Sequence, residues 1–444
     1  MMLTVILPSL NVVQYIKQSL DSVINQSYKE LDIICVDAGS TDGTLDIINE
    51  YAKIDSRIRI INCPEKSYGK QVNMAMDIAI GKYVAIVDTD DFISINMYDN
   101  LIKIAEMYNL DYVKGNYIEY YQFEDDRVYQ HKKSIISEMQ LYNNVINPKE
   151  YPQLHCQDGY LWSGIYNLDF LKNNSIVFNT TSGAAFQDVG FFHQVTYYAE
   201  RVMFIESYGY YYRIARVGNS ISSPNGLRYM LQEYNRLIYQ ELIPKKDTIQ
   251  WESIYKKMIL SFVAECDKKA IYSAFETDAI RPYLEDAIKL MKECINNSYI
   301  REDAFDGKYW NKVYLLLDNP KKYAYYQTKK ANSIKMLINI CKKHIVQSVN
   351  EGRIAVFGCG IRGRRLEELL MKNGINVNEF IDNNVQKIGN VIDGINVISL
   401  KEEKSKNVLY LIAVKNYEED IVEQLINEGI KKEKIYILDS YFWE

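Results

Sequence analysis

Tyr83-Val-Ala-Ile-Val-Asp-Thr-Asp-Asp-Phe92 is the stretch of sequence around which the rest of the chain is organised. Its apolar first half is typical of a buried parallel strand, and it ends in three acids, Asp88, Asp90 and Asp91. Carboxylates this close repel one another, and their ionised forms are costly beside an apolar strand. A divalent cation would relieve both problems, because hard cations take oxygen ligands. The alternative is that the acids are solvated residues that cap the next helix.

Strands and helices alternate along the first half of the chain. Short β-branched and apolar segments predict strands, and apolar residues at a helical period predict helices. This alternation implies right-handed βαβ units and an α/β fold with a doubly wound, mostly parallel sheet. The predicted strands are 3–7, 31–36, 58–61, 83–87 and 112–114, and the predicted helices are 12–26, 44–51, 69–80 and 95–108.

Three polar clusters follow predicted strands, at residues 8–11, 37–44 and 88–91. In a doubly wound sheet the carboxyl ends of parallel strands meet at one crevice, where such folds bind ligands. We therefore expect the three clusters to share one site.

The motifs in these clusters resemble those of glycosyltransferase family 2, whose members have the GT-A fold, over residues 1 to about 215. The family's opening pattern is matched by Val5-Ile-Leu-Pro-Ser-Leu-Asn11, and its second motif by Leu20-Asp-Ser-Val-Ile-Asn-Gln-Ser-Tyr28. Val36-Asp-Ala-Gly-Ser-Thr-Asp-Gly-Thr44 matches the third motif, and Gly81-Lys-Tyr followed by Asp88-Thr-Asp-Asp91 matches the fourth.

The resemblance implies a pocket for the base of a nucleotide-sugar donor. Asp37 would recognise the base, and Pro8, Ser9 and Asn11 would shape the same pocket. The family's second acid in this motif is replaced by Ala38, which bears on recognition of uracil in particular. The alternative for Asp37 is a helix-capping role.

The resemblance also implies that a divalent cation, Mn²⁺ or Mg²⁺, binds with the donor. Asp88 and Asp90 would form the Asp-x-Asp pair that serves the ribose and the metal, and Asp91 is a further candidate metal ligand. Asp88 and Asp90 are thus counted among the donor-binding residues, and Asp90 and Asp91 among the metal ligands.

A diphosphate contact is expected from the third predicted helix. The usual Arg-Asn pair of the family is Val72-Asn73 here, so the contact would fall to Lys70 or Gln71. We count Lys70 and Asn73 as donor-binding candidates. For Asn73 the alternative is packing in the crevice of the sheet.

A catalytic base is expected at Asp188. The segment Gln187-Asp-Val-Gly-Phe191 resembles the family's Glu-Asp-x-x-Phe, whose Asp is the general base of inverting members, with Gln187 in place of Glu. Such a base needs a carboxylate within hydrogen-bond reach of the acceptor hydroxyl. An Asp at a helix start could instead serve only as a cap. Arg213 or Arg216 would reach the diphosphate or form a structural salt bridge.

Two histidines need separate treatment. His193 lies five residues after Asp188, so we place the two on different sides of a helix. A lone histidine is more often a packing residue than a ligand, and we treat His155 in the same way.

The second half of the chain is mainly helical from about residue 227 to 349. An apolar stripe on the last predicted helix, 331–349, could dock on the catalytic domain, pair with a second subunit or rest on a membrane surface. Beyond it, Gly358-Cys-Gly-Ile-Arg-Gly363 follows a predicted strand, and Asp382 ends the next one, as in a dinucleotide-binding turn. The glycines could equally serve packing alone. This part resembles the Rossmann-like domain attached to sugar-modifying acyltransferases and some glycosyltransferases.

These features predict three domains: a GT-A glycosyltransferase domain over 1–218, a helical region over 219–349 and a smaller Rossmann-like α/β domain over 350–444. The length of 444 residues, with 48% apolar and 25% charged residues, suits a globular protein of two or three domains. The net charge of -6 and the lack of a basic block disfavour nucleic-acid binding.

The sequence also bears on the compartment. No run of about 18 apolar residues predicts a membrane span, and the N-terminal residues suit a first strand rather than a signal peptide. Seven cysteines without a Cys-x-x-Cys pair suit free thiols in a reducing compartment. We expect a cytoplasmic protein, with peripheral contact with the inner face of the membrane and homo-oligomer formation both left open.

The resemblance therefore implies a metal-dependent enzyme that moves a sugar, with inversion, from a nucleoside-diphosphate sugar to a hydroxyl. UDP-sugars are the expected donors, and a carbohydrate or lipid-linked molecule the acceptor, in bacterial surface polysaccharide or glycoconjugate synthesis. Two rivals stay open: an NAD-dependent sugar-nucleotide-modifying enzyme centred on the turn at 358–363, and a non-catalytic assembly protein.

Overall fold

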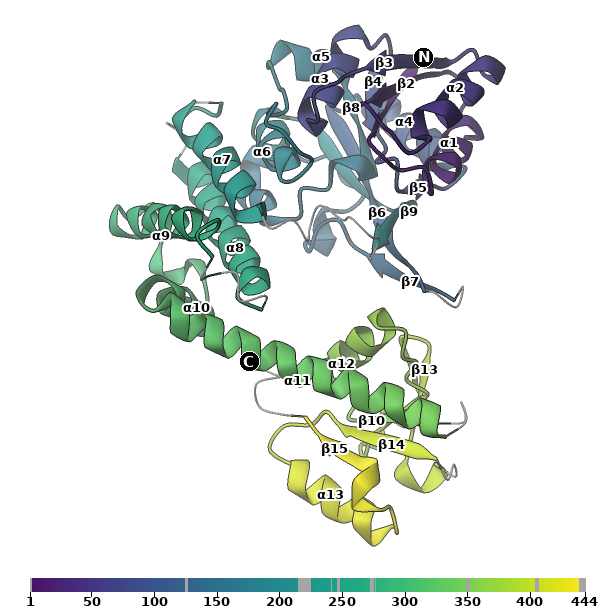
Figure 1. Ribbon diagram of the computed structural model, residues 1–444, viewed down its shortest axis with the longest axis vertical. Coiled ribbons are helices and arrows are strands. Elements are labelled where there is room, and N and C mark those ends of the chain that lie inside the picture. The colour runs from purple at the N-terminus through teal and green to yellow at the C-terminus, as the bar shows by residue number, and fades with distance from the viewer. Residues whose placement is uncertain are drawn as a thin grey trace. The chain divides into compact units, whose positions relative to one another are not determined.

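The computed structural model of the chain describes residues 2–123, 127–214, 225–240, 242–245, 248–271, 275, 277–348, 352–403 and 407–438. The chain divides into two compact units, which are described separately below (Figure 1). The first comprises Met1–Gln122, Gln130–Lys269 and Ala274–Asn319, and the second comprises Phe123–Tyr129, Ala270–Ser273 and Pro320–Glu444. Residues 219–224, the start of the predicted helical region, lie outside the described residues.

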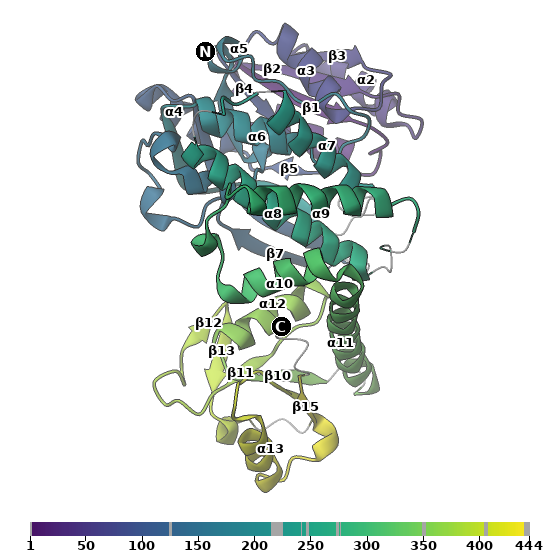
Figure 2. The ribbon, with the colours of Figure 1, turned by 90° about the vertical axis from the view of Figure 1, so that its left-hand side faces the viewer.

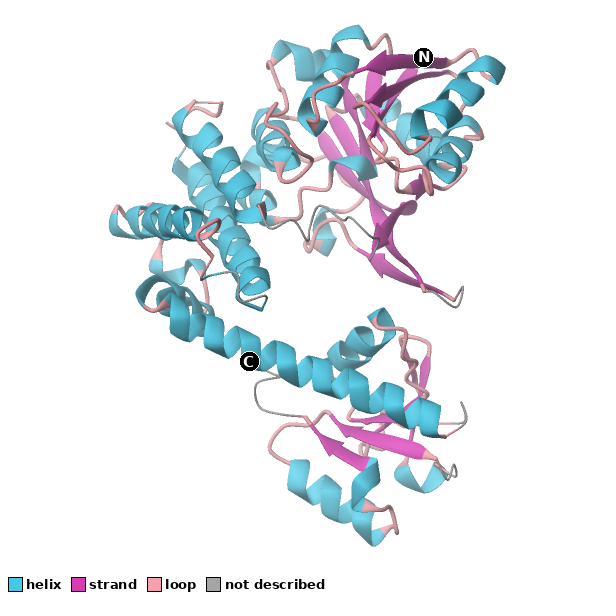
Figure 3. Ribbon diagram, viewed as in Figure 1, coloured by secondary structure: helices cyan, strands magenta, loops and turns pink. Residues whose placement is uncertain are grey.

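A nine-stranded mixed sheet forms the centre of the first unit, and its strands are the larger magenta group in Figure 3. The strand order is β3-β2-β1-β4-β8-β6-β9-β5, with β7 paired to β6. The strands are β1 (Leu3–Ser9), β2 (Leu31–Asp37), β3 (Ile58–Asn62), β4 (Tyr83–Ile86), β5 (Phe92–Ile93), β6 (Tyr112–Gln122), β7 (Val128–Lys133), β8 (Gly164–Asn167) and β9 (Val202–Ile214).

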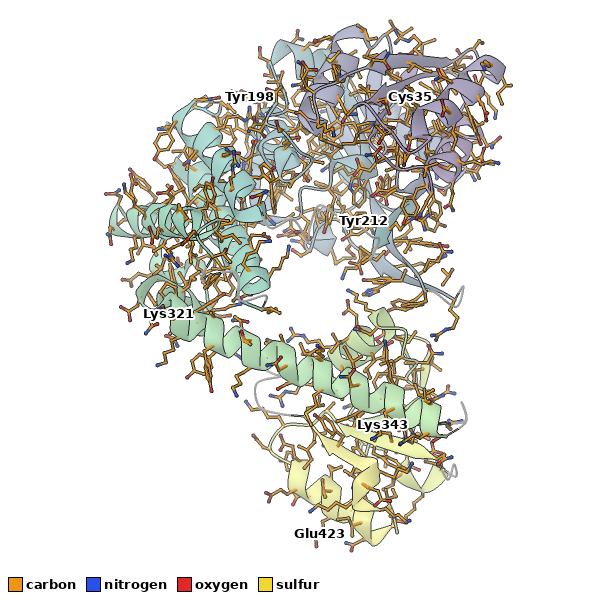
Figure 4. All side chains as sticks on the ribbon, viewed as in Figure 1. Cys35, Tyr198, Tyr212, Lys321, Lys343 and Glu423 are labelled. Carbon is orange, nitrogen blue, oxygen red and sulfur yellow. The ribbon has the colours of Figure 1, made fainter. Side chains whose placement is uncertain are left out.

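The first four strands are parallel, as the sequence predicts. Leu3 pairs with Leu31 of β2 on one side and with Tyr83 of β4 on the other. Every residue of β1, β2 and β4 is buried, which explains why these strands are apolar throughout instead of alternating. Cys35 of β2, labelled in Figure 4, belongs to this buried layer.

Pro8 does not end the first strand, although the sequence predicted that it would. β1 continues to Ser9, and Pro8 pairs with Val36. The carbonyl of Ile6 accepts the N–H of Val87, so residues of the same parity, including Pro8, face β4. Because β4 ends at Ile86, no strand there needs the N–H that proline lacks.

The other half of the sheet is mixed. β8 is antiparallel to both β4 and β6, and β5 is antiparallel to β9, whereas β6 and β9 run parallel. The predicted class, a doubly wound and mostly parallel α/β sheet, is confirmed, and these antiparallel strands are an addition that the sequence did not reveal. Because of these antiparallel strands, β9 lies close to the loop that follows β4.

Helices cover the sheet and then continue as a separate layer (Figures 1 and 2). Within the first unit α6 packs against α3 and α7, and α9 packs against α7 and α10. Within the described residues, no helix combines the length and apolar character that crossing a membrane requires. The helices are α1 (Ile16–Ile24), α2 (Thr44–Ile54), α3 (Tyr68–Ile78), α4 (Met97–Tyr108), α5 (Leu168–Asn173), α6 (Gln187–Tyr198), α7 (Gly226–Tyr239), α8 (Thr248–Ile271), α9 (Arg281–Asn296) and α10 (Gly307–Asp318).

The second unit has its own six-stranded sheet, in the order β12-β13-β11-β10-β14-β15, with only β12 antiparallel. Its elements are α11 (Pro320–Gln347), β10 (Arg353–Phe357), α12 (Ile361–Lys372), β11 (Glu379–Ile381), β12 (Val391–Ile392), β13 (Ile395–Ile398), β14 (Val408–Ile412), α13 (Glu418–Asn427) and β15 (Ile435–Ile437).

The apolar stripe of α11 packs on a surface that the sequence analysis did not consider. Leu337 and Cys341 are fully buried in one hydrophobic core with Val356 of β10 and Leu411 of β14. The buried part of the stripe therefore packs on the sheet of the second unit.

The glycine turn of the second unit has a packing explanation. A Cβ on Gly363 would lie 1.8 Å from the carbonyl oxygen of Gly358, so only glycine allows α12 to approach β10 this closely. The carboxylate of Asp382 accepts hydrogen bonds from the backbone N–H and the thiol of Cys359 and pairs with Lys387 at 3.1 Å. Nucleotide binding at this turn stays a prediction.

The close approach of α3 to the chain at Asn179 leads to a stability prediction. A Cβ on Gly69 would lie 1.9 Å from the backbone oxygen of Asn179, whereas a Cβ on Gly307, also in the first turn of a helix, would have no atom within 4 Å. We expect Gly69→Ala to lower the free energy of unfolding by about 1–3 kcal/mol because the backbone must shift. Gly307→Ala, the control, should leave it unchanged or raise it by about 0.4–1 kcal/mol. Urea unfolding measures both, and equal midpoints for the two variants would contradict the packing.

Candidate functional site

A cavity of about 880 Å³ opens in the first unit. It brings together Pro8 and Ser9 from the end of β1, Asp88 and Asp90 from the loop after β4, and Asp188 from α6. Five other predicted site residues do not line it: Asn11, Asp37, Lys70, Asn73 and Asp91.

The acidic loop after β4 is held by β9. The backbone N–H of Arg213 donates to Asp91 Oδ1 at 2.7 Å, and the phenol of Tyr210 donates to Asp91 Oδ2 at 2.9 Å. The Arg213 side chain also donates from Nε to the carbonyl of Asp90 at 2.9 Å. Burial, together with the charges of Asp90 and Asp88, raises the pKa of Asp91 well above its usual range. Asp91 therefore anchors the loop, while Asp88 and Asp90 face the cavity.

The Arg213 side chain mainly holds neighbouring segments together through hydrogen bonds. Its guanidinium donates to the side-chain oxygens of Gln18 and Gln122, at 2.6 and 3.1 Å, and lies over the ring of Tyr15. Arg213 also lines the cavity, but its side-chain N–H groups donate to the partners named here and to Asp90. Arg216, the other basic candidate, lies outside the described residues.

The ends of β1 and β2 are tied together beside the cavity. Asn11 adopts a positive φ of 51°, donates its N–H to Ser40 and accepts the N–H of Thr41. Asp37 is buried, and its Oδ2 accepts the backbone N–H groups of Gly39 and Ser40. Its Oδ1 is buried without a hydrogen-bond partner among the described residues. That oxygen is an unused hydrogen-bond acceptor at the end of β2.

Gln71 lines the cavity as a bridge between the same strands. Its amide donates to the carbonyls of Ser9 and Val36, at 3.1 and 2.7 Å, so its two N–H groups hold the ends of β1 and β2. Both donors are used, which leaves no free N–H for a diphosphate.

Lys70 and Asn73 have partners away from the cavity. Lys70 forms an ion pair with Glu65. Asn73 exchanges two hydrogen bonds with the backbone of Phe178, at 2.9 and 3.0 Å, which is the packing role that the sequence left open. Neither residue is brought to the cavity with the acids.

Asp188 lies in the first turn of α6, and the residue before the helix, Phe186, has a left-handed backbone with φ of 64°. Such a conformation is rare for an aromatic residue and is often found at functional sites. Gln187 fixes this start: its Oε1 accepts the N–H of Gly69 at 2.8 Å, and its amide donates to Thr181. The glutamine that departs from the family pattern thus joins α6 to α3.

The environment of Asp188 suits a base that works near neutral pH. Burial raises its pKa to about 6, and the negative charge of Glu233 adds to this, whereas backbone N–H groups and the charge of Lys114 oppose it. Lys114 is itself buried, and burial lowers its pKa to about 7. Its Nζ donates to the carbonyl of Tyr160 at 3.1 Å. The sequence analysis did not identify this lysine, which lies in β6.

Aromatic rings line another part of the cavity. Trp162 stacks on Tyr160 and Tyr212, with ring centroids 4.9 and 5.1 Å apart, and on Tyr210 at 4.1 Å. Tyr212, labelled in Figure 4, comes from β9. Flat apolar faces with polar edges suit sugar rings. Only the fold shows which of the aromatic residues meet here.

The two histidines are brought together, which the sequence did not predict. His155 and His193 are fully buried, with their Nδ1 atoms 3.1 Å apart. His193 and Asp188 both line the cavity although they are five residues apart on α6, which the sequence analysis did not predict. The cavity wraps around α6 far enough to touch Asp188, Val189, Phe192 and His193, two pairs four residues apart.

α8 supplies a wall that the sequence analysis missed. The residues of α8 that line the cavity recur every three or four positions, so they share one helical face. They could have been found only by asking which face of this helix mixes apolar and charged residues. They are Lys257, Leu260, Ser261, Ala264, Glu265 and Lys268.

Comparisons with known proteins agree with this picture. Residues 4–169 match the model of glycosyl transferase family 2, and residues 350–436 match the model described as C2185-like, N-terminal. The uncharacterized glycosyltransferase EpsJ of Bacillus subtilis is 28% identical over 217 residues, which are 48% of this chain and 61% of EpsJ. TuaG of the same organism, a glycosyltransferase whose name assigns it to teichuronic acid biosynthesis, is 45% identical over 92 residues, 20% of this chain and 36% of TuaG.

Among solved structures, residues 1–349 of TarS from S. aureus, crystallised with UDP-GlcNAc, share the fold. The TM-score is 0.55 at 17% identity, over 75% of this chain and 92% of that one. The chain spans about three fifths or less of the length of EpsJ and TuaG, so the likeness concerns a domain and not those whole proteins. Residues 4–169 of this chain are therefore similar to glycosyl transferase family 2, and the first unit has the GT-A fold.

Proposed function

We propose that this protein is a metal-dependent glycosyltransferase that moves a sugar from a nucleoside-diphosphate sugar to a hydroxyl group, with inversion at the anomeric carbon. The observation that carries the proposal is the meeting of Asp88, Asp90 and Asp188 at one cavity from distant parts of a GT-A fold. A carboxylate pair and a separate carboxylate of raised pKa are the parts that such a transfer needs.

The donor end of the cavity is formed by the end of β1 and the loop after β4. Asp37, which pairs with Ser9 but does not itself line the cavity, has a buried Oδ1 without a hydrogen-bond partner among the described residues, and this oxygen would accept an N–H from the base. A UDP-sugar is the first donor to test, since TarS, which shares the fold, was crystallised with UDP-GlcNAc. Lys70 and Asn73 are left out of the proposed site because their polar groups are used elsewhere.

The residues at this end fit a divalent cation. Asp88 and Asp90 both line the cavity, and their charges are among the causes, after burial, that raise the pKa of the anchored Asp91, so negative charge is concentrated at this end. Mn²⁺ and Mg²⁺ take carboxylate ligands and commonly complete their shell with substrate phosphates. We propose Asp88 and Asp90 as the ligands; when bound, the cation would neutralise charge on the leaving diphosphate.

Asp188 would act as the base. The acceptor hydroxyl gives its proton to the Asp188 carboxylate as its oxygen forms a bond to the anomeric carbon. On the opposite face the bond from that carbon to the diphosphate oxygen breaks, and the nucleoside diphosphate leaves with the electron pair. Attack opposite the leaving group gives inversion.

The stacked rings of Tyr160, Trp162 and Tyr212 would hold a sugar ring against the cavity wall. A role in bacterial surface polysaccharide synthesis is supported by the likeness to TuaG over 92 residues. All seven cysteines are free thiols, which supports a reducing compartment such as the cytoplasm.

Removal of the base gives the first functional prediction. Asp188→Asn should lower kcat by about 10²–10⁴-fold, because the amide cannot take the proton, and should leave UDP affinity unchanged. The measurements are nucleoside diphosphate release and calorimetry with UDP and Mn²⁺. Asp169→Asn is the matched control, since Asp169 also lies in the first turn of a helix but does not line the cavity. A fully active Asp188→Asn enzyme would refute the assignment.

The pH dependence follows from the same carboxylate. Only ionised Asp188 can accept a proton, so kcat/KM should fall as the pH drops below about 6 and level off above it. The charge of Glu233 raises this pKa, so Glu233→Gln should move the acid limb to lower pH. The exposed Glu200 is the control position, where Glu200→Gln should leave the limb in place. An acid limb that stays or moves upward in Glu233→Gln would count against Asp188.

The proposed metal ligand can be tested by binding alone. Asp90→Ala should weaken UDP binding in the presence of Mn²⁺ by about tenfold or more, about 1.4 kcal/mol, and abolish the difference between Mn²⁺ and EDTA. Asp77→Ala, an exposed position on α3 outside the cavity, is the control. Unchanged dependence on Mn²⁺ in Asp90→Ala would exclude Asp90 as a ligand.

A further inference from the structure

A buried chain of four polar groups ends at the cavity wall. Gln250 donates its amide N–H to the carbonyl of Lys149 at 3.0 Å, and its Oε1 lies 2.9 Å from His155 Nε2. His155 Nδ1 lies 3.1 Å from His193 Nδ1. The side chains of Gln250, His155 and His193 are all nine-tenths or more buried.

The backbone carbonyl of Lys149 determines which atom carries each proton in this series of hydrogen bonds. A backbone carbonyl can only accept, so the nitrogen of the Gln250 amide must face it and the amide oxygen must face His155. His155 Nε2 therefore carries a proton, and in a neutral ring His155 Nδ1 is then an acceptor. It follows that His193 Nδ1 carries the shared proton and that His193 Nε2 has a bare lone pair.

His193 Nε2 is buried and has no hydrogen-bond partner among the described residues. Burial, with the nearby His155 and the charge of Lys257, lowers the pKa of His193 well below its usual value, so the ring stays neutral at physiological pH. His193 is one of the residues that line the cavity. An unsatisfied buried acceptor at a cavity is costly unless a ligand satisfies it.

α8 adds a second set of open acceptors to the same cavity. Glu265 is 1% exposed and lines the cavity, and neither carboxylate oxygen accepts a hydrogen bond from the described residues. The ammonium groups of Lys268 and Lys269 lie 3.5 and 3.2 Å from these oxygens and compensate the charge. The Glu265 carboxylate can thus still accept hydrogen bonds from a ligand.

We propose that His193 and Glu265 form the subsite that binds hydroxyl groups of the acceptor substrate, and that this acceptor is a neutral, hydroxyl-rich carbohydrate at the end of the cavity that α8 lines. The proposal rests on the proposed glycosyl transfer and adds to it the chemical class of the acceptor. Both groups offer lone pairs, which hydroxyl groups satisfy by donating.

A phosphorylated acceptor fits this subsite poorly. The oxygens of a phosphate are hydrogen-bond acceptors and would find no donor at His193 Nε2 or Glu265. The negative charge of the phosphate would also be repelled by the carboxylate of Glu265. The lysines of this wall are engaged: Lys257 donates to the carbonyl of Cys156 and to Asp158, each at 3.3 Å, and Lys268 pairs with Glu265.

The first test reads the protons of the histidines in the full chain at pH 7. The sequence has four histidines, so ¹⁵N-labelled histidine gives few signals, which His131→Gln and His344→Gln variants sort by elimination. We expect His155 to carry its proton on Nε2 and His193 on Nδ1. A proton on His193 Nε2 would overturn the proposal.

The second test adds probes with UDP and Mn²⁺ present: methyl glycosides of glucose, galactose, mannose and N-acetylglucosamine, and separately inorganic phosphate. At least one glycoside should shift the His193 Nε2 signal, and phosphate should not. A shift with phosphate only, or with no glycoside, would overturn the proposal. UDP and Mn²⁺ affinity is measured on the same sample by calorimetry, so a protein that binds no UDP points instead to failure of the proposed function.

Kinetics with the responsive glycoside complete the test. Glu265→Leu and His193→Phe should raise the KM for the glycoside by about tenfold or more and change kcat less, since hydrogen bonds to the acceptor are lost. Glu252→Gln is the control, because Glu252 lies on α8 but pairs with Arg301 and does not line the cavity. Glu265→Gln, which keeps an acceptor, covers the case that Glu265→Leu does not fold, and it should recover part of the affinity. An unchanged KM in folded Glu265 variants would contradict the subsite.

Discussion

The hold of β9 on the loop after β4 is the constraint on which the candidate site depends. Asp91 receives the backbone N–H of Arg213 and the phenol of Tyr210, and both donors come from a strand more than a hundred residues away. With Asp91 fixed and its neighbour Asp90 bound through its carbonyl, the side chains of Asp88 and Asp90 are left at the cavity. The mixed half of the sheet thus places β9 beside the loop after β4.

The charged groups at the two ends of the cavity differ in the same way as their proposed roles. At the β4 end, acids lie close together and raise the pKa of the buried Asp91, a setting that favours a cation. At the α6 end, burial and Glu233 raise the pKa of Asp188, while Lys114 limits the rise. The two ends differ in the way that the proposed chemistry requires: one neutralises charge on a leaving group, and the other takes a proton from a hydroxyl.

Much of the fold was predictable because its signals are local. The apolar runs of β1, β2 and β4 and the polar residues at their ends identify a parallel sheet and its crevice from the sequence. The path of β9, the wall formed by α8 and the meeting of His155 with His193 were not predictable, since each depends on contacts between distant segments. For the candidate site, the acids that face the cavity were identified by motif, but motif alone could not separate Asp88 and Asp90 from Asp91. That distinction depends on donors from Tyr210 and Arg213.

The family patterns did not identify the contacts that Gln187 and Asn73 make. Gln187 replaces an acid and joins α6 to α3, and Asn73 packs against the backbone of Phe178. Gln187 is buried and Asn73 is partly buried, and both side chains are bonded to backbone groups, which a pattern match cannot foresee.

A crystal structure of the full chain with UDP and Mn²⁺ tests the central claim most directly. The account predicts the base beside Asp37, the metal between the diphosphate and the carboxylates of Asp88 and Asp90, and an open path from there to Asp188. UDP bound instead at the turn formed by residues 358–363, or a metal held away from Asp88 and Asp90, would contradict it.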